Sequence, residues 1–203
     1  MEQVAFDTIL LDAMGVIYVN GDDVGELLIP FLREKGVGAP DADIEDAYRE
    51  ASLGKFSSGR FWQRFGVDPS VEDEYLARHA LSPGLRSFLR QVPGQIRLAC
   101  LSNDVSEWSW KLRERFALTD RIKHWTISGD VGVRKPDPRI YELAKAVCVE
   151  SARTLFVDDR LANVEAARAS GFLAVLFGQG DRSVEAARTF DDVLRMIRTG
   201  AIA

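Results

Sequence analysis

The sequence predicts an α/β fold, a doubly wound parallel sheet with a small helical cap inserted after its first strand. Three patterns lead to this prediction. From residue 82 onward, short apolar runs alternate with amphipathic helical patterns, which is typical of βαβ units whose helices cover both faces of a sheet. Residues 22–80 carry helical periodicity only. The first apolar run, Ile9–Leu11, is followed by Asp12 and then Gly15, as expected of a buried strand that leads into a tight loop.

The cap is expected over residues 19–81, so that the core comprises residues 1–18 and 82–203. Apolar residues of the cap recur at helical spacing in stripes at 24–32, 44–51 and 61–65, the first with Asp22 or Asp23 as its N-terminal cap. Ser70–Asp73 resembles a capping box that would start a fourth helix. We expect four arginines of the cap to be solvated or ion-paired, although one could face an anionic substrate. These four are Arg33, Arg49, Arg60 and Arg64.

The core is expected to alternate strands and helices after residue 82. Strands are predicted at 96–101, 125–128, 155–157 and 172–177, and helices at 104–112, 137–147, 161–170 and 183–198. Asp104 and Glu107 have the spacing of a capping box, and Pro138 suits the first position of the helix that follows it.

The composition is that of an ordinary globular chain. Of the 203 residues, 46% are hydrophobic and 28% are charged, and the formal net charge is −5. Because no basic run is present, nucleic-acid binding is not indicated. Cys100 and Cys148 lie in apolar runs and are expected to be reduced core thiols. The apolar stretch 9–19 contains Asp12, unlike a signal peptide or a membrane span. We expect a cytoplasmic monomer or homodimer with no membrane or nucleic-acid partner.

Polar residues gather where the expected strands end. Asp12 follows the first strand, Ser102-Asn103-Asp104 follows the second, and Asp158-Asp159 follows a later one. Lys135 lies in a proline-containing loop before a helix. In open parallel sheets, active sites collect at the carboxyl ends of the strands, so we expect these side chains to lie close together.

Each of these segments alone has a simpler structural interpretation. Asp12 could form a turn, Ser102–Asp104 could cap a helix, and Lys135 could be an ordinary loop lysine. The pair Asp158-Asp159 fits such an interpretation less well. Adjacent carboxylates at a buried strand end repel each other and need a cation or hydrogen bonds.

In this order and with these spacings, the four segments resemble the motifs of the haloacid dehalogenase-like (HAD) hydrolase superfamily over nearly the whole chain. The inserted segment resembles the helical cap of subclass I, a lid that closes over the catalytic core. The resemblance implies that Asp12 is the nucleophile and forms a covalent intermediate. It also implies that Ser102 donates a hydrogen bond to the transferring group, with Asn103 beside it. Lys135 would neutralise the anionic substrate and orient Asp12.

The resemblance implies a Mg²⁺ cofactor as well. Asp12, the backbone carbonyl of Met14 and Asp159 fall on the positions of metal ligands, and Asp158 falls on a supporting position. Magnesium prefers oxygen ligands in an octahedron and keeps several waters, so these few protein oxygens suffice.

Position 14 departs from the family pattern, because phosphatases of the family usually carry there a second aspartate that acts as general acid and base. Met14 can supply a backbone carbonyl but no proton. Losing general acid–base help lowers a rate by a factor of ~10² to 10⁴. Either a cap residue or water replaces the acid, the leaving group needs no proton, or turnover is slow.

Three functions are compatible with these residues. The favoured one is Mg²⁺-dependent hydrolysis of a small phosphorylated metabolite with an altered proton path. The second is a metal-independent dehalogenase-like reaction, which the non-acidic Met14 and the position of Tyr141 suggest. The third is a low-activity or non-enzymatic relative that binds a phosphorylated ligand or a partner. The pair Asp158-Asp159 favours the first function, because two adjacent acids have no role without a cation.

Overall fold

A parallel sheet of six strands forms the centre of the computed structural model, which describes residues 5–178 and 186–202. The strands are β1 (Thr8–Leu11), β2 (Arg97–Ser102), β3 (His124–Ile127), β4 (Thr154–Asp158), β5 (Leu173–Phe177) and β6 (Ala186–Ala187). Their order is β3-β2-β1-β4-β5-β6. The chain therefore starts in the middle of the sheet, builds outward through β2 and β3, and then builds outward on the other side. This order confirms the predicted doubly wound α/β sheet.

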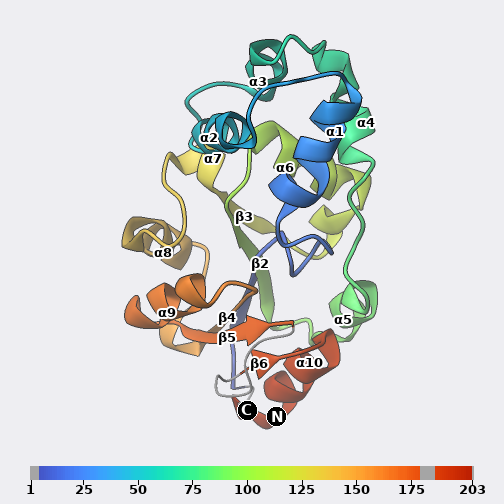
Figure 1. The fold of residues 1–203 in the computed structure, drawn as a ribbon. Helices are drawn as coiled ribbons and strands as arrows, with labels where there is room; N and C mark the ends of the chain where they lie inside the picture. The colour runs from blue at the N-terminus through green and yellow to red at the C-terminus, as the bar shows by residue number, and fades with distance from the viewer. Residues whose placement is uncertain (1–4, 179–185, 203) are drawn as a thin grey trace.

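Helices cover both faces of this sheet, with α8 and α9 on one side and α5 and α10 on the other (Figure 1). The helices after residue 82 are α5 (Leu85–Gln91), α6 (Ser106–Arg115), α7 (Ser128–Val131), α8 (Pro138–Lys145), α9 (Leu161–Ala169) and α10 (Phe190–Thr199), with 3₁₀ turns at Leu118–Asp120 and Ser151–Arg153. Along β1, Ile9 and Leu11 belong to one buried cluster and Leu10 to the other. Because both faces are covered, the strands appear in the sequence as continuous apolar runs.

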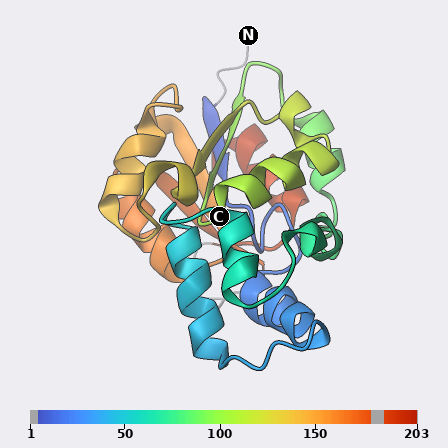
Figure 2. The same ribbon diagram turned by 90° about the horizontal axis from the view of Figure 1, so that it is seen from above.

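Residues 19–81, called the cap segment below, are all described and contain helices but no strand of the sheet. Their elements are a π-helical turn (Val24–Leu28), α1 (Ile29–Glu34), α2 (Asp41–Ala51), α3 (Ser58–Arg64), a 3₁₀ turn (Pro69–Val71) and α4 (Glu72–Leu76). These helices stand at one end of the molecule in Figure 1 and group together in the view from above in Figure 2. The two connections to the core run side by side. The amide of Val19 donates to the carbonyl of Ala80 at 3.0 Å, and that of Ser82 to the carbonyl of Ile17 at 2.9 Å.

Helix α6 packs into the aromatic cluster of the cap segment, although it follows β2 in the chain. Trp62 of α3 and Trp108 of α6 both donate from Nε1 to Oε2 of Glu72, each at 2.9 Å. The rings of Phe61 and Tyr75 lie 5.3 Å and 5.0 Å from the ring of Trp108, measured between centroids. Shared aromatic contacts and a buried carboxylate therefore hold the cap segment against α6.

The predicted helix over 183–198 is wrong in its first part. Ala186–Ala187 pair with Leu176–Phe177 as β6, and residues 183–185 lie outside the described residues. Helix α10 begins only at Phe190, where Thr189 and Asp192 form a capping box. Pairing with β5 overrides the helical propensity of the two alanines.

Two predicted capping boxes are also wrong, and helix α5 was not predicted. Asp104 is buried and accepts a hydrogen bond from the amide of Val105, so it does not cap α6. In the cap segment, Asp68 accepts a hydrogen bond from the amide of Ser70, because Pro69 starts a 3₁₀ turn before α4. Asp104 thus bonds to the next amide instead of capping α6, and Asp68 takes the capping position that the spacing gave to Ser70.

The cysteines and most of the cap arginines follow the predictions. Cys100 is buried and Cys148 is half-buried, and both are free thiols. Three arginines of the cap segment are in ion pairs, Arg33 with Asp41, Arg64 with Glu50 and Arg78 with Glu34. None of the described helices is long and apolar enough to cross a membrane.

Candidate active site

The predicted site residues converge at the carboxyl ends of the three central strands. Asp12 follows β1, Ser102 is the last residue of β2, and Asp158 is the last residue of β4. All three are buried. Because β1 lies between β2 and β4, this is the point where the sheet changes winding direction, and parallel sheets bind ligands at such a point.

Lys135, in the loop between α7 and α8, ties these strand ends together. Its Nζ lies 2.7 Å from Oδ1 of Asp12 and 2.7 Å from Oδ2 of Asp158, and it donates to the carbonyl of Leu101 at 2.9 Å. These three acceptors match the three donors of an ammonium group. Burial lowers the pKa of Lys135, but Asp12 and Asp158 outweigh burial and raise it above its ordinary value. The buried lysine therefore stays charged beside the nucleophile candidate.

Asp158 is fully engaged in hydrogen bonds. Besides Lys135, it accepts from Nδ2 of Asn163 at 3.0 Å and 3.1 Å and from the amide of Arg160 at 2.8 Å. Asn163 belongs to the first turn of α9, and sequence reasoning assigned it no role. Asn163 could have been identified as a site residue, because the helix that carries it starts just after the acidic pair. Asp158 is thus a fixed anion with little capacity for further partners.

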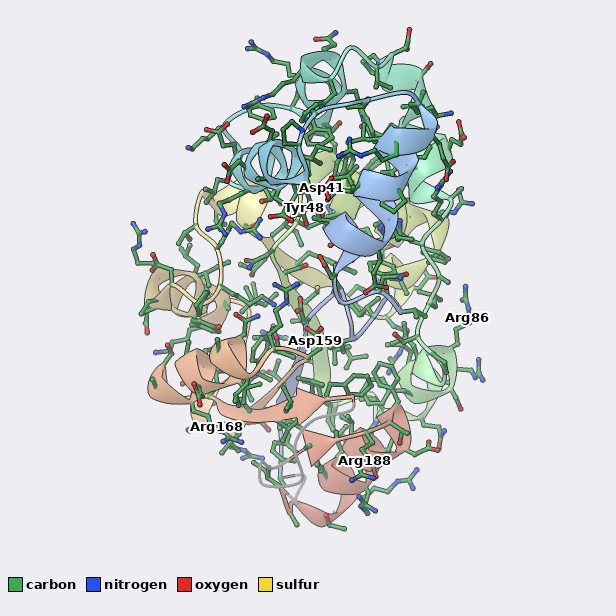
Figure 3. All side chains as sticks on the ribbon, in the orientation of Figure 1. Asp41, Tyr48, Arg86, Asp159, Arg168 and Arg188 are labelled. Atoms are coloured by element: carbon green, nitrogen blue, oxygen red, sulfur yellow. The ribbon has the colours of Figure 1, made fainter. Side chains whose placement is uncertain are left out.

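Asp159 has the opposite environment. Its Oδ1 is buried and has no hydrogen-bond partner among the described residues. Burial, with the charge of Asp158 added, raises the pKa of Asp159 to about 6. A side chain at Gly15 or Gly21 would collide with the carboxylate of Asp159, so two glycines leave room for it. Figure 3 shows Asp159 at the sheet, facing the side of the molecule that carries Tyr48 and the cap segment.

Three carboxylates form a cluster that suits a hard cation. One oxygen each from Asp12, Asp158 and Asp159 lie within 4.8 Å of one another. Burial raises the pKa of Asp12 well above its ordinary value, and Asp158 adds to this rise while Lys135 opposes it. Clustered oxygens of this kind, one of them without a partner, are the ligands that Mg²⁺ prefers. The residues present therefore fit the magnesium that the family motifs imply.

Ser102 and Asn103 have different environments. Oγ of Ser102 is buried and has no partner among the described residues, and Ser102 lines a cavity between the core and the cap segment. Asn103 bonds to the backbone of Lys135 in both directions, accepting from its amide at 2.8 Å and donating to its carbonyl at 3.0 Å. Ser102 thus has a hydroxyl available for a ligand, and Asn103 shapes the loop that carries Lys135.

A cavity of about 200 Å³ lies between this strand edge and the cap segment. The core contributes Asp12, Met14, Ser102, Asn103, Arg134, Lys135, Arg160 and Asn163 to its lining, and the cap segment contributes Gly21, Asp22, Asp23, Val24, Glu45, Asp46, Tyr48 and Arg49. Arg49 is therefore the cap arginine that faces the site, whereas sequence reasoning could not choose among four. Arg134 and Arg160 were missed, because only the folded loops bring them to this lining.

Tyr141 lies away from this cavity. It is buried against Phe156 and Phe172, and its hydroxyl donates to the carbonyl of Asn163 at 2.9 Å. It is not among the residues that line the cavity. The structure therefore gives Tyr141 a packing position beneath the site.

Comparison with known proteins identifies related sequences and folds. A family model described as haloacid dehalogenase-like hydrolase matches residues 6–171. A phosphoglycolate phosphatase of Pseudomonas syringae pv. tomato is 26% identical over 191 residues, which cover 85% of this chain and 69% of the relative. The chain spans about half the length of the other curated relatives that it matches, 45% to 47%.

Solved structures share the fold at low sequence identity. A HAD family enzyme from Bacteroides thetaiotaomicron, in complex with magnesium and inorganic phosphate, superposes with a TM-score of 0.70 at 18% identity, covering 87% of this chain and 96% of that one. The L-2-haloacid dehalogenase of Xanthobacter autotrophicus, with chloropropionic acid covalently bound, superposes with a TM-score of 0.68 at 18% identity, covering 97% and 100%. Both a phosphate-binding enzyme and a dehalogenase thus share this architecture.

Proposed function

The chain belongs to the haloacid dehalogenase-like hydrolase family, and on this premise we propose that it hydrolyses a small phosphorylated metabolite, with Mg²⁺ as cofactor, through an intermediate on Asp12. The observation that carries the proposal is the carboxylate cluster of Asp12, Asp158 and Asp159, whose oxygens lie within 4.8 Å of one another beside a polar cavity. A relative named phosphoglycolate phosphatase and the similar structure in complex with magnesium and inorganic phosphate support the same chemistry.

In the proposed reaction, Asp12 attacks phosphorus and Lys135 holds it in place. Oδ1 of Asp12 is occupied by Lys135 and by the amide of Ala13, so Oδ2 is the attacking atom. The ammonium of Lys135 also neutralises charge on the phosphoryl group, and the hydroxyl of Ser102 donates a hydrogen bond to it. Water then attacks the aspartyl phosphate, which releases phosphate and restores Asp12.

The magnesium would be held by Asp12, the Met14 carbonyl and Asp159. Asp159 has a buried oxygen without a partner among the described residues, whereas Asp158 is already saturated by hydrogen bonds. When bound, the ion neutralises negative charge on the phosphoryl oxygens. Asp158 supports the site by fixing Lys135 and by accepting from Asn163.

The substrate we propose is small and anionic, and the cap segment would act as its lid. The lid of residues 19–81 would hinge at the paired connections near Val19 and Ser82 and close over the core of residues 1–18 and 82–203. Arg49, Arg134 and Arg160 line the cavity and suit a ligand with a second polar or anionic group. The free thiols agree with a reducing, cytoplasmic location.

Met14 favours a second candidate function, in which the chain binds a phosphorylated ligand with little turnover. A thioether cannot protonate a leaving group. The dehalogenase-like alternative is less well supported, because the acidic cluster has no role in a metal-independent reaction.

A screen of phosphate esters with and without Mg²⁺ tests the proposal, with Asp12→Asn as the matched variant. We expect phosphate release that needs both Mg²⁺ and Asp12. Binding of phosphorylated compounds without release would favour the low-turnover candidate. Release that is equal with magnesium and with chelator would argue for the metal-independent one.

A further inference from the structure

The proposed reaction lacks an identified proton donor. An alkyl alcohol leaves phosphorus slowly as an alkoxide, so its oxygen needs a proton as the bond breaks. Met14 lines the cavity but has no proton to give. The lysine is held by three acceptors and is needed as a cation. A donor must therefore be sought among the other groups that line the cavity.

Five carboxyl groups line the cavity, and one of them has the required environment. The five are Asp12, Asp22, Asp23, Glu45 and Asp46. Asp12 is the proposed nucleophile, and Asp22, Glu45 and Asp46 are exposed. Asp23 is 4% exposed, and its Oδ2 is buried without a hydrogen-bond partner among the described residues. Asp104 is also buried with an unpartnered oxygen, but it does not line the cavity.

Local structure does not account for the side chain of Asp23. It stands just before the π-helical turn, where an acid usually caps the helix. Asp23 makes no side-chain capping bond there. Its neighbour Asp22 does so instead, accepting from the amide of Gly25 at 3.2 Å. Burying a carboxyl oxygen that has no partner among the described residues is costly, which points to a use in the cavity.

Burial favours the protonated form of Asp23, and two nearby arginines oppose this effect. Burial, with Asp22 added, raises the pKa of Asp23 to about 7, while Arg160 and Arg134 oppose the rise. The groups that face it come from several elements: Asp22 on its own turn, Tyr48 on α2, Tyr75 on α4, Asp104 after β2, Arg134 before α8 and Arg160 before α9. A carboxylic acid in this range can both give and take a proton.

We propose that Asp23 of the cap segment is the general acid and base that Met14 cannot be, an inference that rests on the proposed function. In the first step an oxygen of Asp12 bonds to phosphorus, and the bond from phosphorus to the alkyl oxygen breaks. The electron pair stays on that oxygen, which takes the proton of Asp23 and leaves as an alcohol. In the second step water bonds to phosphorus and gives a proton to Asp23, and the bond between phosphorus and Asp12 breaks.

The test compares Asp23→Asn with the wild type on two esters, an alkyl phosphate and para-nitrophenyl phosphate, in the presence of Mg²⁺. The constant kcat/KM reports the first step only. We expect it to fall by ~10² or more on the alkyl ester and by less than about tenfold on the aryl ester, whose oxygen leaves as a stable anion. Because asparagine cannot accept the proton of the attacking water, kcat on the aryl ester should also fall. Intact mass should then show a phosphoryl group on the chain.

Asp46→Asn is the matched control, an isosteric change of an exposed carboxylate in the same cavity. We expect it to keep the wild-type ratio between the two esters. If Asp23→Asn does not fold, the pH profile of the wild type decides. As pH rises above about 7, kcat/KM should fall on the alkyl ester and not on the aryl ester.

The outcomes separate this inference from the proposed function. Equal losses of kcat/KM on both esters, or no loss on the alkyl ester, overturn the role of Asp23 while the function stands. The wild type could also hydrolyse neither ester and be as inactive as Asp12→Asn. In that case the proposed function fails, and the role of Asp23 fails with it.

Discussion

Lys135 determines the charge balance of the site at the level of single residues. A buried ammonium between two buried carboxylates is an arrangement in which each partner depends on the others. Removing one member leaves uncompensated charge in a medium that solvates it poorly. An ion pair with the same distance contributes little stability at the surface, because water screens the attraction between its charges.

We therefore expect Lys135→Met to lower the free energy of unfolding at neutral pH by about 3–5 kcal/mol, because Asp12 and Asp158 lose their shared cation. Lys145→Met is the matched control. Lys145 also lies 2.7 Å from its carboxylate partner, but its side chain is 34% exposed, against 1% for Lys135. Urea denaturation of both variants measures the difference. A loss as small in Lys135→Met as in Lys145→Met would show that the buried pair adds no stability.

Asp23 should impose a pH dependence on stability. Its pKa is raised from 3.8 to about 7 in the folded chain, so the folded state favours the protonated form. This stabilisation is complete below pH 3.8 and is lost as pH rises toward and through 7. At pH 8 the ionised group costs about 4 kcal/mol, a cost that Asn does not carry. We expect Asp23→Asn to be more stable than the wild type at pH 8 and to approach it at low pH. Urea denaturation at several pH values measures the free energy of unfolding of both proteins. If Asp23 were not buried, the two free energies would change with pH in parallel.

Sequence patterns could identify residues at strand ends but not residues that become functional by packing. Asp12, Ser102 and Asp158 could be chosen because each follows a recognisable apolar run, and the structure brings them together. Asp22 and Asp23 are both plausible helix caps in the sequence. Only the fold shows that Asp22 makes the cap bond while Asp23 is buried at the cavity.

At the scale of elements, the strands were easier to predict than the helix boundaries. A strand such as β4 is buried on both faces and appears as an unbroken apolar run. Helix starts depend on which polar side chain satisfies the first free amides. Asp104 does not cap α6, and before α4 the capping residue is Asp68 instead of Ser70. β6 has two residues, and its pairing with β5 is a long-range contact that no local pattern specifies.

Helix α2 of the cap segment and the residues just after it contact the site loops directly. The hydroxyl of Tyr48 donates to the carbonyl of Asn103 at 3.1 Å, and Oγ of Ser128 donates to the carbonyl of Ser52 at 2.6 Å. Just beyond α2, Gly54 has a φ of 71° and lies against the carbonyl of Gly129. The close fit at Gly54 therefore helps to set how near the cap segment lies to the loops of Asn103 and Lys135.

We expect Gly54→Ala to lower kcat/KM, because its methyl group would collide with Gly129 and push α2 away from the cavity. Gly36→Ala is the matched control. Gly36 also has a positive φ, 82°, but no atom lies within 4 Å of the position of a side chain. Both variants should lose about 1–2 kcal/mol of stability from backbone strain, and only Gly54→Ala should lose activity. Equal kinetics in the two variants would mean that the spacing of α2 does not affect the site.

At the scale of the whole molecule, the cavity lies between the core and the cap segment, which share one buried hydrophobic cluster. The carboxylate cluster lies at the carboxyl ends of the central strands, and the cap segment stands at this end of the molecule (Figure 1). Three clustered acids with one lysine leave excess negative charge in the interior. A ligand that neutralises this charge binds the folded chain and not the unfolded one, so its binding should appear as global stability.

The last prediction is that Mg²⁺ raises the melting temperature. At a hundredfold excess over its Kd, a ligand specific to the folded state adds about 2.7 kcal/mol. For a chain of 203 residues this corresponds to a rise in Tm of about 5–10 °C. Thermal unfolding at neutral pH, with and without Mg²⁺, measures it. Asp159→Ala should abolish the rise, because it removes the carboxylate whose oxygen has no other partner, and Asp46→Asn should retain it. If Asp159→Ala and the wild type respond equally, Asp159 is not a ligand. A calorimetric titration that gives equal Mg²⁺ affinities for the two proteins would lead to the same conclusion.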